Sequence, residues 1–471
     1  MIAVKTPTGI SKRVSIKNII MQGTVWGSLF CTASMDKLGQ HVYNNKELLY
    51  KYKGMVDIPS LGMVDDIMAI QKCSDDALKI NAVINGFIES KKLSLSKTKC
   101  HRIHVQKKAN QTTHCPKLKV HDGEMCDSSK EKYLGDIIDK SGKISNTVED
   151  RRNKGFGIVS EILAIVNDIP LGKHKMEIGL MLRQAMLLNG ILFNSEAWHA
   201  ISEHDIKLLE AVDEHLLRSL VGGHSKTPLE FLYLEAGALP IRFLISCRRM
   251  IYLQTLLKRP DDEITKRVYL AQKESPTHGD YYNLVKADWE MMGEPLNESA
   301  IVATSIDAHK RKVKAKVRMA AFEFLQNKKK QHSKVKDVQY NKLETQRYMT
   351  SPVFNDHEVS LLYAMRSRAL ECKSNYKNKY KNDDLLCSIC SLEEDDQPHI
   401  MQCKVLNSKM ASDDVVREKI EYNDVFRDHH KQKVIVTLYE KLLKIRKTML
   451  EDQQNDPSTS DMALKNCYNL Q

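Results

Sequence analysis

The chain contains 471 residues, of which 42% are hydrophobic and 6% aromatic, and this composition allows two or three domains with buried cores. Its formal net charge of +12 favours nucleic acid or another anionic surface as the partner. Residues 1–17 lack the apolar core of a signal peptide, and the best apolar run, residues 178–198, is interrupted by Arg183, Gln184 and Asn189. We therefore expect a protein that is neither secreted nor membrane-spanning. Eleven scattered cysteines fit an intracellular protein, nuclear or cytoplasmic.

The first 140 residues predict a mixture of short strands and helices. Residues 75–91 have apolar side chains at positions 77, 80, 83, 84, 87 and 88, which is the spacing of one face of a helix. A second helix is expected at 28–38, and strands are expected at 14–21, 51–58, 101–105 and 133–138. This region is therefore α+β in character.

The pattern from residue 148 to residue 259 is helical throughout, and residues 258–262 predict a boundary. Residues 310–336 then contain eleven Lys or Arg and one acid, Glu323. Two interpretations of this basic segment stay open: a solvated helix face or linker, and a surface that contacts phosphates. A last helix is expected at 432–449, followed by a polar, disordered tail from residue 451.

Two adjacent aspartates, Asp65 and Asp66, lie between apolar residues in the octet 61–68, at the expected tip of a hairpin. Nucleotidyl transfer uses carboxylates that hold two Mg²⁺ ions, one activating the 3′ hydroxyl and one stabilising the leaving pyrophosphate. Neighbouring residues on a strand point to opposite faces, so one of the two carboxylates can face a cleft. The alternative is an ordinary surface turn, where an Asp-Asp pair is common.

The segments around this octet favour the first interpretation. Residues 21–30 (MQGTVWGSLF), 91–100 (KKLSLSKTKC) and 132–135 (KYLG) flank the octet in a characteristic order and spacing. Together these segments resemble successive blocks of the palm of a non-LTR retrotransposon reverse transcriptase. The resemblance covers residues 14–140 as palm, and residues 148–259 resemble the thumb of that family.

The resemblance implies a role for each matching residue. Asp65 and Asp66 would be catalytic and would bind Mg²⁺. The other implied contacts are with template and nucleotide, through Gln22, Gly23, Lys97 and Lys99, and with the primer end, through Tyr133, Leu134 and Gly135. The family also uses an aspartate on a strand well before the Gln-Gly block and an aromatic residue where this chain has Met63. We therefore expect an N-terminally truncated polymerase without activity of its own.

A compact group of metal-ligand residues follows in the C-terminal third of the chain. Cys387, Cys390, His399 and Cys403 have the number, type and spacing of the ligands of a tetrahedral structural Zn²⁺. The preceding run, residues 361–381, is basic and tyrosine-rich, and it resembles the lead-in to the zinc knuckle of non-LTR elements.

Between the ligands lies an acidic loop, residues 393–396, which should repel phosphate. We therefore expect the knuckle to brace the structure, while neighbouring cations bind nucleic acid. These cations are Arg366, Arg368, Lys377, Lys379 and Lys381.

The expected organisation has five parts. They are a partial palm at 1–140, a helical thumb-like region at 141–260, a basic helical linker at 261–345, a zinc-knuckle region at 346–410, and a C-terminal helix with a disordered tail at 411–471. The predicted function is a reverse transcriptase fragment that binds RNA and DNA. A zinc-containing nucleic-acid-binding protein without catalysis is the alternative, and a helical interaction protein with merely solvating charge is a third interpretation.

Overall fold

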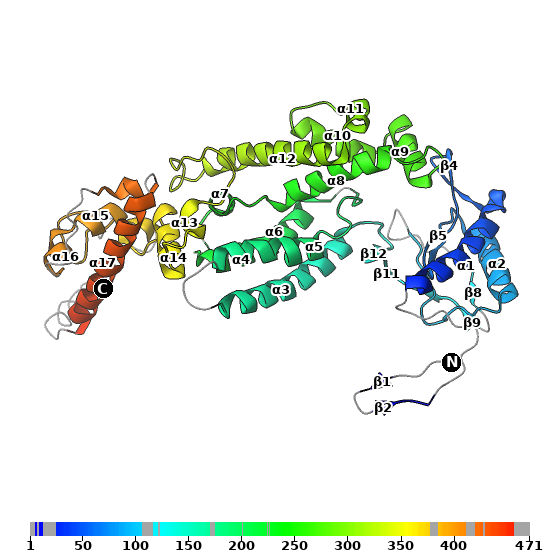
Figure 1. Cartoon of the computed structure of the whole chain (residues 1–471), viewed down its shortest axis with the longest axis horizontal. Coiled ribbons are helices and arrows are strands. Elements are labelled where there is room, and N and C mark those ends of the chain that lie inside the picture. Colours follow the sequence, from blue (N-terminus) through cyan, green and yellow to red (C-terminus); the bar gives the residue numbers. More distant parts are fainter. Residues whose placement is uncertain are drawn as a thin grey trace, which may run out of the picture. The chain divides into compact units, whose positions relative to one another are not determined.

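The chain folds into an α+β structure, seen in a computed structural model (Figure 1). The residues it describes are 5–6, 9–12, 25–105, 116–120, 123–169, 175–199, 201–223, 225, 227–376, 385–410, 420–426 and 429–455. They divide into two compact units: unit 1 comprises Met1–Asn146 and Thr255–Leu284, and unit 2 comprises Thr147–Gln254 and Val285–Gln471.

The strands of unit 1 form short two-stranded ladders, and within the described residues no ladder has a third strand. The pair β7 (His101–Arg102) and β10 (Cys126–Asp127) is parallel, whereas the others are antiparallel. The antiparallel pairs are β1 (Lys5–Thr6) with β2 (Gly9–Ile10), β3 (Tyr50–Tyr52) with β4 (Val56–Ile58), β5 (Leu61–Met63) with β6 (Asp66–Met68), β8 (Lys119–Val120) with β9 (Gly123–Glu124), and β11 (Lys130–Tyr133) with β12 (Asp136–Asp139).

Two helices provide the main core of unit 1. Helices α1 (Val25–Tyr43) and α2 (Ser74–Ser90) bury Leu38, Ile80 and Phe87 against each other, and the 3-10 turn η1 (Lys46–Leu48) adds to this core. Ile67 of β6 is partly buried against the same cluster. A second, smaller core forms where α9 (Ile264–Glu274) packs on the β3–β4 hairpin.

Unit 2 is helical. Its elements are α3 (Ser145–Asn167), α4 (Lys175–Leu182), η2 (Arg183–Leu187), α5 (Leu188–Ile191), α6 (Glu203–Val221), α7 (Leu229–Ala236), α8 (Ile241–Leu257), α10 (Tyr281–Met291), α11 (Glu298–Ala303), α12 (Ile306–Lys329), α13 (Arg347–Thr350), α14 (Asp356–Arg366), η3 (Lys373–Tyr376), α15 (Gln397–Gln402), α16 (Lys404–Ser408), η6 (Tyr422–Phe426) and α17 (His429–Asn455). Ser202 and Asp205 form a capping box that begins α6, and Gly222, with φ 64°, ends that helix.

Buried arginine–carboxylate pairs join distant helices of unit 2. Nε of Arg183 lies 2.6 Å from Asp213, and Nη1 of Arg249 lies 2.8 Å from Asp288. Two further pairs, described below, are Glu235 with Arg366 and Asp395 with Arg446. A buried charge is tolerated only when it is paired and hydrogen-bonded, so these contacts fix which helix faces meet.

The helices expected at 28–38 and 75–91 are confirmed as parts of α1 and α2. The single strand expected at 133–138 is wrong, because Leu134 and Gly135 form a tight turn between β11 and β12. The first residues of the expected polar tail, 451–455, are helical and belong to α17. The strand expected at 14–21 lies outside the described residues. Across the part of the chain that the structure describes, no helix combines the length and apolar character of a membrane span.

Candidate functional site

The aspartate hairpin, residues 61–68, is the ladder β5–β6 and is closed by a two-residue turn of Val64 and Asp65. Ile67 packs on the core between α1 and α2. Side chains alternate along a strand, so Asp66 points to the opposite face, and both aspartates are exposed. Val64 adopts φ 59°, which is a strained conformation for a β-branched residue.

The β11–β12 hairpin lies against the aspartate hairpin. The hydroxyl of Tyr133 donates to the carbonyl of Leu61 at 3.3 Å. Burial raises the pKa of Tyr133, and the negative charge of Asp66 raises it further. Leu134 (φ 48°) and Gly135 (φ 95°) form the turn, as in the two-residue hairpin turns that require two positive φ angles. Two of the segments expected in a palm are therefore neighbours.

Of the template and nucleotide contacts expected around the aspartates, the structure describes only Lys97 and Lys99. Gln22 and Gly23 lie outside the described residues, although α1, which follows them closely in sequence, packs on β5. Lys97 and Lys99 are exposed, and neither forms an ion pair with an aspartate of the hairpin. The side chain of Lys97 instead lies against Gly123, where an added Cβ would come within 2.8 Å of it.

A third carboxylate does not join Asp65 and Asp66 in the described ranges. Asp36 accepts a hydrogen bond from Gln40 on its own helix, and Asp57 pairs with Lys51 at 3.9 Å. An isolated pair of exposed carboxylates is a weak site for Mg²⁺, which usually keeps several waters and is shared with substrate phosphates.

The Cys/His cluster consists of Cys387, Cys390, His399 and Cys403. The four ligand atoms lie within 4.8 Å of one another, and Cys390 Sγ is 3.3 Å from His399 Nε2. Tetrahedral zinc with Zn–S bonds of about 2.3 Å places sulfur atoms about 3.8 Å apart, so a small inward movement fits the ion. Three thiols and an imidazole, mostly buried, can thus hold a metal ion such as zinc.

Local backbone geometry forms this cluster. The N–H of Cys387 donates to the carbonyl of Glu393 at 2.8 Å, and Ser391, with φ 54°, turns the chain after Cys390. Burial opposes ionisation of the Cys390 thiol, but the backbone N–H groups of Leu392 and Glu393 lower its pKa to about 7. His399 and Cys403 then lie one turn apart at α15, with a backbone hydrogen bond of 2.7 Å between them. Burial instead raises the pKa of Cys387 to about 11, so the loop favours a thiolate at Cys390 and not at Cys387.

The acidic loop also makes contacts inside the fold, while Glu393 and Glu394 stay exposed. Glu393 lies 3.1 Å from Nδ1 of His399, and Asp396 accepts from the backbone N–H of the same histidine. Asp395 is fully buried and pairs with Arg446 of α17 at 2.6 Å. In the sequence, the position of Asp396 three residues before His399 predicts its helix-capping role. Nothing in the sequence predicts the partners of Glu393 and Asp395.

Of the cations expected to bind nucleic acid, Arg366 requires a correction. It is 2% exposed, and its guanidinium forms two hydrogen bonds with Glu235 and one with the carbonyl of Val425. The hydroxyls of Tyr340 and Tyr348 also donate to Glu235. Arg366 is thus a buried structural residue and does not belong to a basic surface. Arg368 is exposed as expected, and Lys377, Lys379 and Lys381 lie outside the described residues.

A different basic surface lies on α12. The buried positions of this helix recur every four residues, from His309 to Lys329. On the exposed side Lys310, Arg311 and Lys314 form no ion pair with any described residue; we call these three the basic face of α12. Lys312 and Lys316, by contrast, are paired with Glu294 at 3.5 and 2.5 Å. The sequence marked this segment as basic but did not separate the paired lysines from the unpaired ones.

A scan of the chain against models of protein families gives no match, and a search among curated proteins gives none either.

Proposed function

We propose that this chain binds RNA and DNA as part of a polymerase related to the reverse transcriptases of non-LTR retrotransposons. The observation that carries the proposal is the basic face of α12, with three exposed and unpaired cations on one helix. Such cations release counterions when they meet phosphates, and this release drives sequence-independent binding.

The aspartate hairpin supports the polymerase part of the proposal. Its two carboxylates are exposed at a strained turn, and the β11–β12 hairpin lies beside it. Backbone strain of this kind persists where the surroundings hold it, and it clusters at functional positions. In a polymerase the carboxylates would bind Mg²⁺ together with the triphosphate of the incoming nucleotide.

In the proposed nucleic-acid-binding protein, the Cys/His cluster would have a structural role. When bound, a zinc ion would crosslink the loop at 387–403, and Asp395 and Arg446 would transmit that rigidity to α17. The cluster then acts as a brace for the helices rather than as a contact with nucleic acid.

The basic face is tested by measuring RNA affinity across a range of salt concentrations. The variant Arg311→Gln/Lys314→Gln should weaken binding of single-stranded RNA and reduce the slope of log K against log salt by about 1.4, since each lost phosphate contact removes about 0.7. The matched control is Lys312→Gln/Lys316→Gln on the same helix. Those lysines share the carboxylate of Glu294, which offsets one of their two charges, so a smaller change is expected. Equal changes in both variants would contradict the proposal.

A nucleic-acid-binding protein without catalysis is the second candidate, favoured by the lack of a third carboxylate beside Asp65 and Asp66 in the described residues. We expect the purified chain to extend no primer on an RNA template in the presence of Mg²⁺, because removing one electrostatic element of a catalytic site typically costs about 3–4 kcal/mol. Extension that depends on Mg²⁺ and is lost in Asp65→Asn would show that the chain is a complete polymerase.

A further inference from the structure

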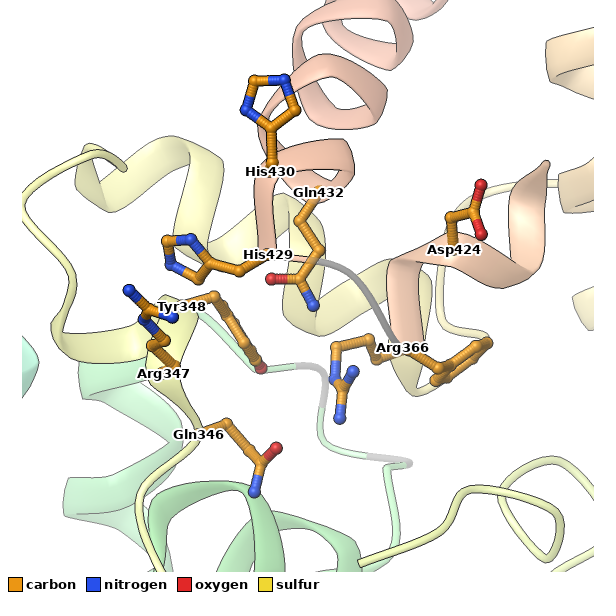
Figure 2. A pocket seen from close by; sticks show the side chains of 9 residues that line it. Gln346, Arg347, Tyr348, Arg366, Asp424, His429, His430 and Gln432 are labelled. Atoms are coloured by element: carbon orange, nitrogen blue, oxygen red, sulfur yellow. The ribbon is translucent and has the colours of Figure 1, made fainter. Parts of the chain in front are cut away.

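A pocket of about 800 Å³ opens in unit 2 beside α13, α14, η6 and the first turn of α17 (Figure 2). This volume lies within the range of about 300–1,000 Å³ that is common for small-ligand sites. The side chains that line it include two arginines, two histidines and two aromatic residues. Neither the aspartate hairpin nor the Cys/His cluster contributes to it.

Arg366 forms the buried part of this lining. A guanidinium has five N–H donors. Three are used here: Nε and Nη2 donate to Glu235, and Nη1 donates to Val425. The remaining two donors have no acceptor among the described residues. The guanidinium also lies over the rings of Tyr348 and Phe426, at 5.4 and 5.3 Å from their centroids, which fixes its plane.

Arg347 supplies an exposed cation to the same pocket. It follows Gln346 at the start of α13, and its guanidinium forms no ion pair with a described residue. The one acidic residue in the lining, Asp424, already pairs with Lys431 at 3.0 Å. The charge of Arg366 is balanced by Glu235, so among the described lining residues Arg347 adds an excess of positive charge. In Figure 2, Arg347 lies beside Tyr348, and His429 and His430 project from the first turn of α17.

We propose that this pocket binds the phosphate group of an unpaired nucleotide in an RNA or DNA strand. The planar guanidinium of Arg347 matches phosphate oxygens geometrically, and Arg366, whose charge is already paired, can add its two remaining N–H donors from the same lining. The half-buried ring of Phe426 offers an apolar surface for the base or sugar of the same nucleotide. The inference rests on the proposed nucleic-acid binding and adds a second, concave contact to the basic face of α12.

The test compares the full chain with Arg347→Gln and with Lys409→Gln. Lys409 is an exposed lysine that follows α16, does not line the pocket, and loses the same single charge. Affinity for a short, fluorescently labelled single-stranded RNA should fall about tenfold in Arg347→Gln and no more than about twofold in the control, because a charge-assisted hydrogen bond is lost only in the former. RNA carrying 4-thiouridine should also form a photoadduct on the peptide that contains Phe426 in the wild-type chain.

The outcomes separate this inference from the proposed function. If RNA binds but the two variants weaken it equally, and photoadducts form only on α12, the pocket assignment is overturned while the proposed function stands. If the wild-type chain binds no RNA, both are overturned. If Arg347→Gln instead abolishes binding of adenosine monophosphate and leaves RNA affinity at the control level, the pocket is a site for free nucleotide and the strand contact is wrong.

Discussion

Both the aspartate hairpin of unit 1 and the Cys/His cluster of unit 2 bring together side chains of types that can bind metals, yet these side chains are held in different ways. The hairpin offers two exposed carboxylates on a two-stranded ladder. The cluster offers four ligands that are mostly buried, and a carboxylate contacts one of them. A closed set of four can retain an ion by itself, whereas two carboxylates need further oxygen atoms from a substrate. Unit 2 therefore has the residues that could hold a metal ion by themselves, whereas an ion at the hairpin would need oxygen ligands from a bound substrate as well.

The largest expected effect is the loss of the metal. We expect one zinc ion per chain in the purified protein and none in Cys387→Ala, measured by elemental analysis. Structural zinc sites contribute apparent binding free energies of about 10–16 kcal/mol at pH 7, so the segment 385–410 should lose protection from hydrogen exchange. Helices α1 and α2 in unit 1 should keep theirs.

The control for the metal experiment is Cys247→Ala. Cys247 is a buried cysteine of α8 outside the cluster, so this variant should keep its zinc. Unchanged metal content in Cys387→Ala would contradict the assignment of the cluster, and it would also remove the contrast between the two units.

The next largest effect is expected from Glu235→Gln in unit 2. This change leaves the charge of Arg366 buried without its partner, and breaking such a pair costs about 3–5 kcal/mol. Urea unfolding followed by circular dichroism measures the change in the free energy of unfolding. Glu344→Gln is the matched control because Glu344 forms an exposed pair with Lys342, and such pairs contribute about 1 kcal/mol or less. A similar loss in both variants would show that the buried pair does not hold unit 2 together.

A smaller effect is expected at Glu393, the carboxylate beside the cluster. Its contact with Nδ1 of His399 leaves Nε2 of the ring toward Cys390, where it would bind a metal ion held by the cluster. Losing a carboxylate of this kind lowers metal affinity about 10–100-fold. Competition of the protein with a zinc chelator should therefore show this loss in Glu393→Gln. The neighbouring Glu394→Gln, whose side chain accepts a hydrogen bond from Ser374, should keep the wild-type affinity.

The parts that sequence predicts well are those fixed by local spacing. Two examples are the spacing of apolar residues in α2 and the spacing of the four ligands in the Cys/His cluster. Both patterns lie within one short segment of the sequence. The partners of Arg366 and Arg446 are set by tertiary packing instead. Glu235 precedes Arg366 by 131 residues, and Asp395 precedes Arg446 by 51. Arg366 was expected to face nucleic acid because its neighbours in sequence are basic, and nothing local indicates that it is buried.

The aspartate hairpin also has a feature that the sequence does not predict, here within a single turn. The pattern of apolar residues predicts a hairpin around Asp65 and Asp66, and the ladder β5–β6 has this form. The turn, however, consists of Val64 and Asp65, and Val64 takes a left-handed conformation that its β-branched side chain disfavours. Sequence preferences would place glycine or asparagine there, so the strain is visible only in three dimensions.

The smallest expected effect comes from relieving that strain, and it bears directly on the contrast between the two units. A non-glycine residue held in the left-handed region is destabilising by about 1–3 kcal/mol, and Val64 has this conformation. Glycine removes this strain, but its greater conformational entropy in the unfolded chain offsets about 0.5–1 kcal/mol of the gain. Val64→Gly should thus stabilise the aspartate hairpin by about 1 kcal/mol, measured as slower hydrogen exchange of the β5 and β6 amides. Met63→Gly, one residue earlier on the strand, should destabilise it. If Val64→Gly destabilises the hairpin as well, contacts of the Val64 side chain outweigh the backbone strain of the turn.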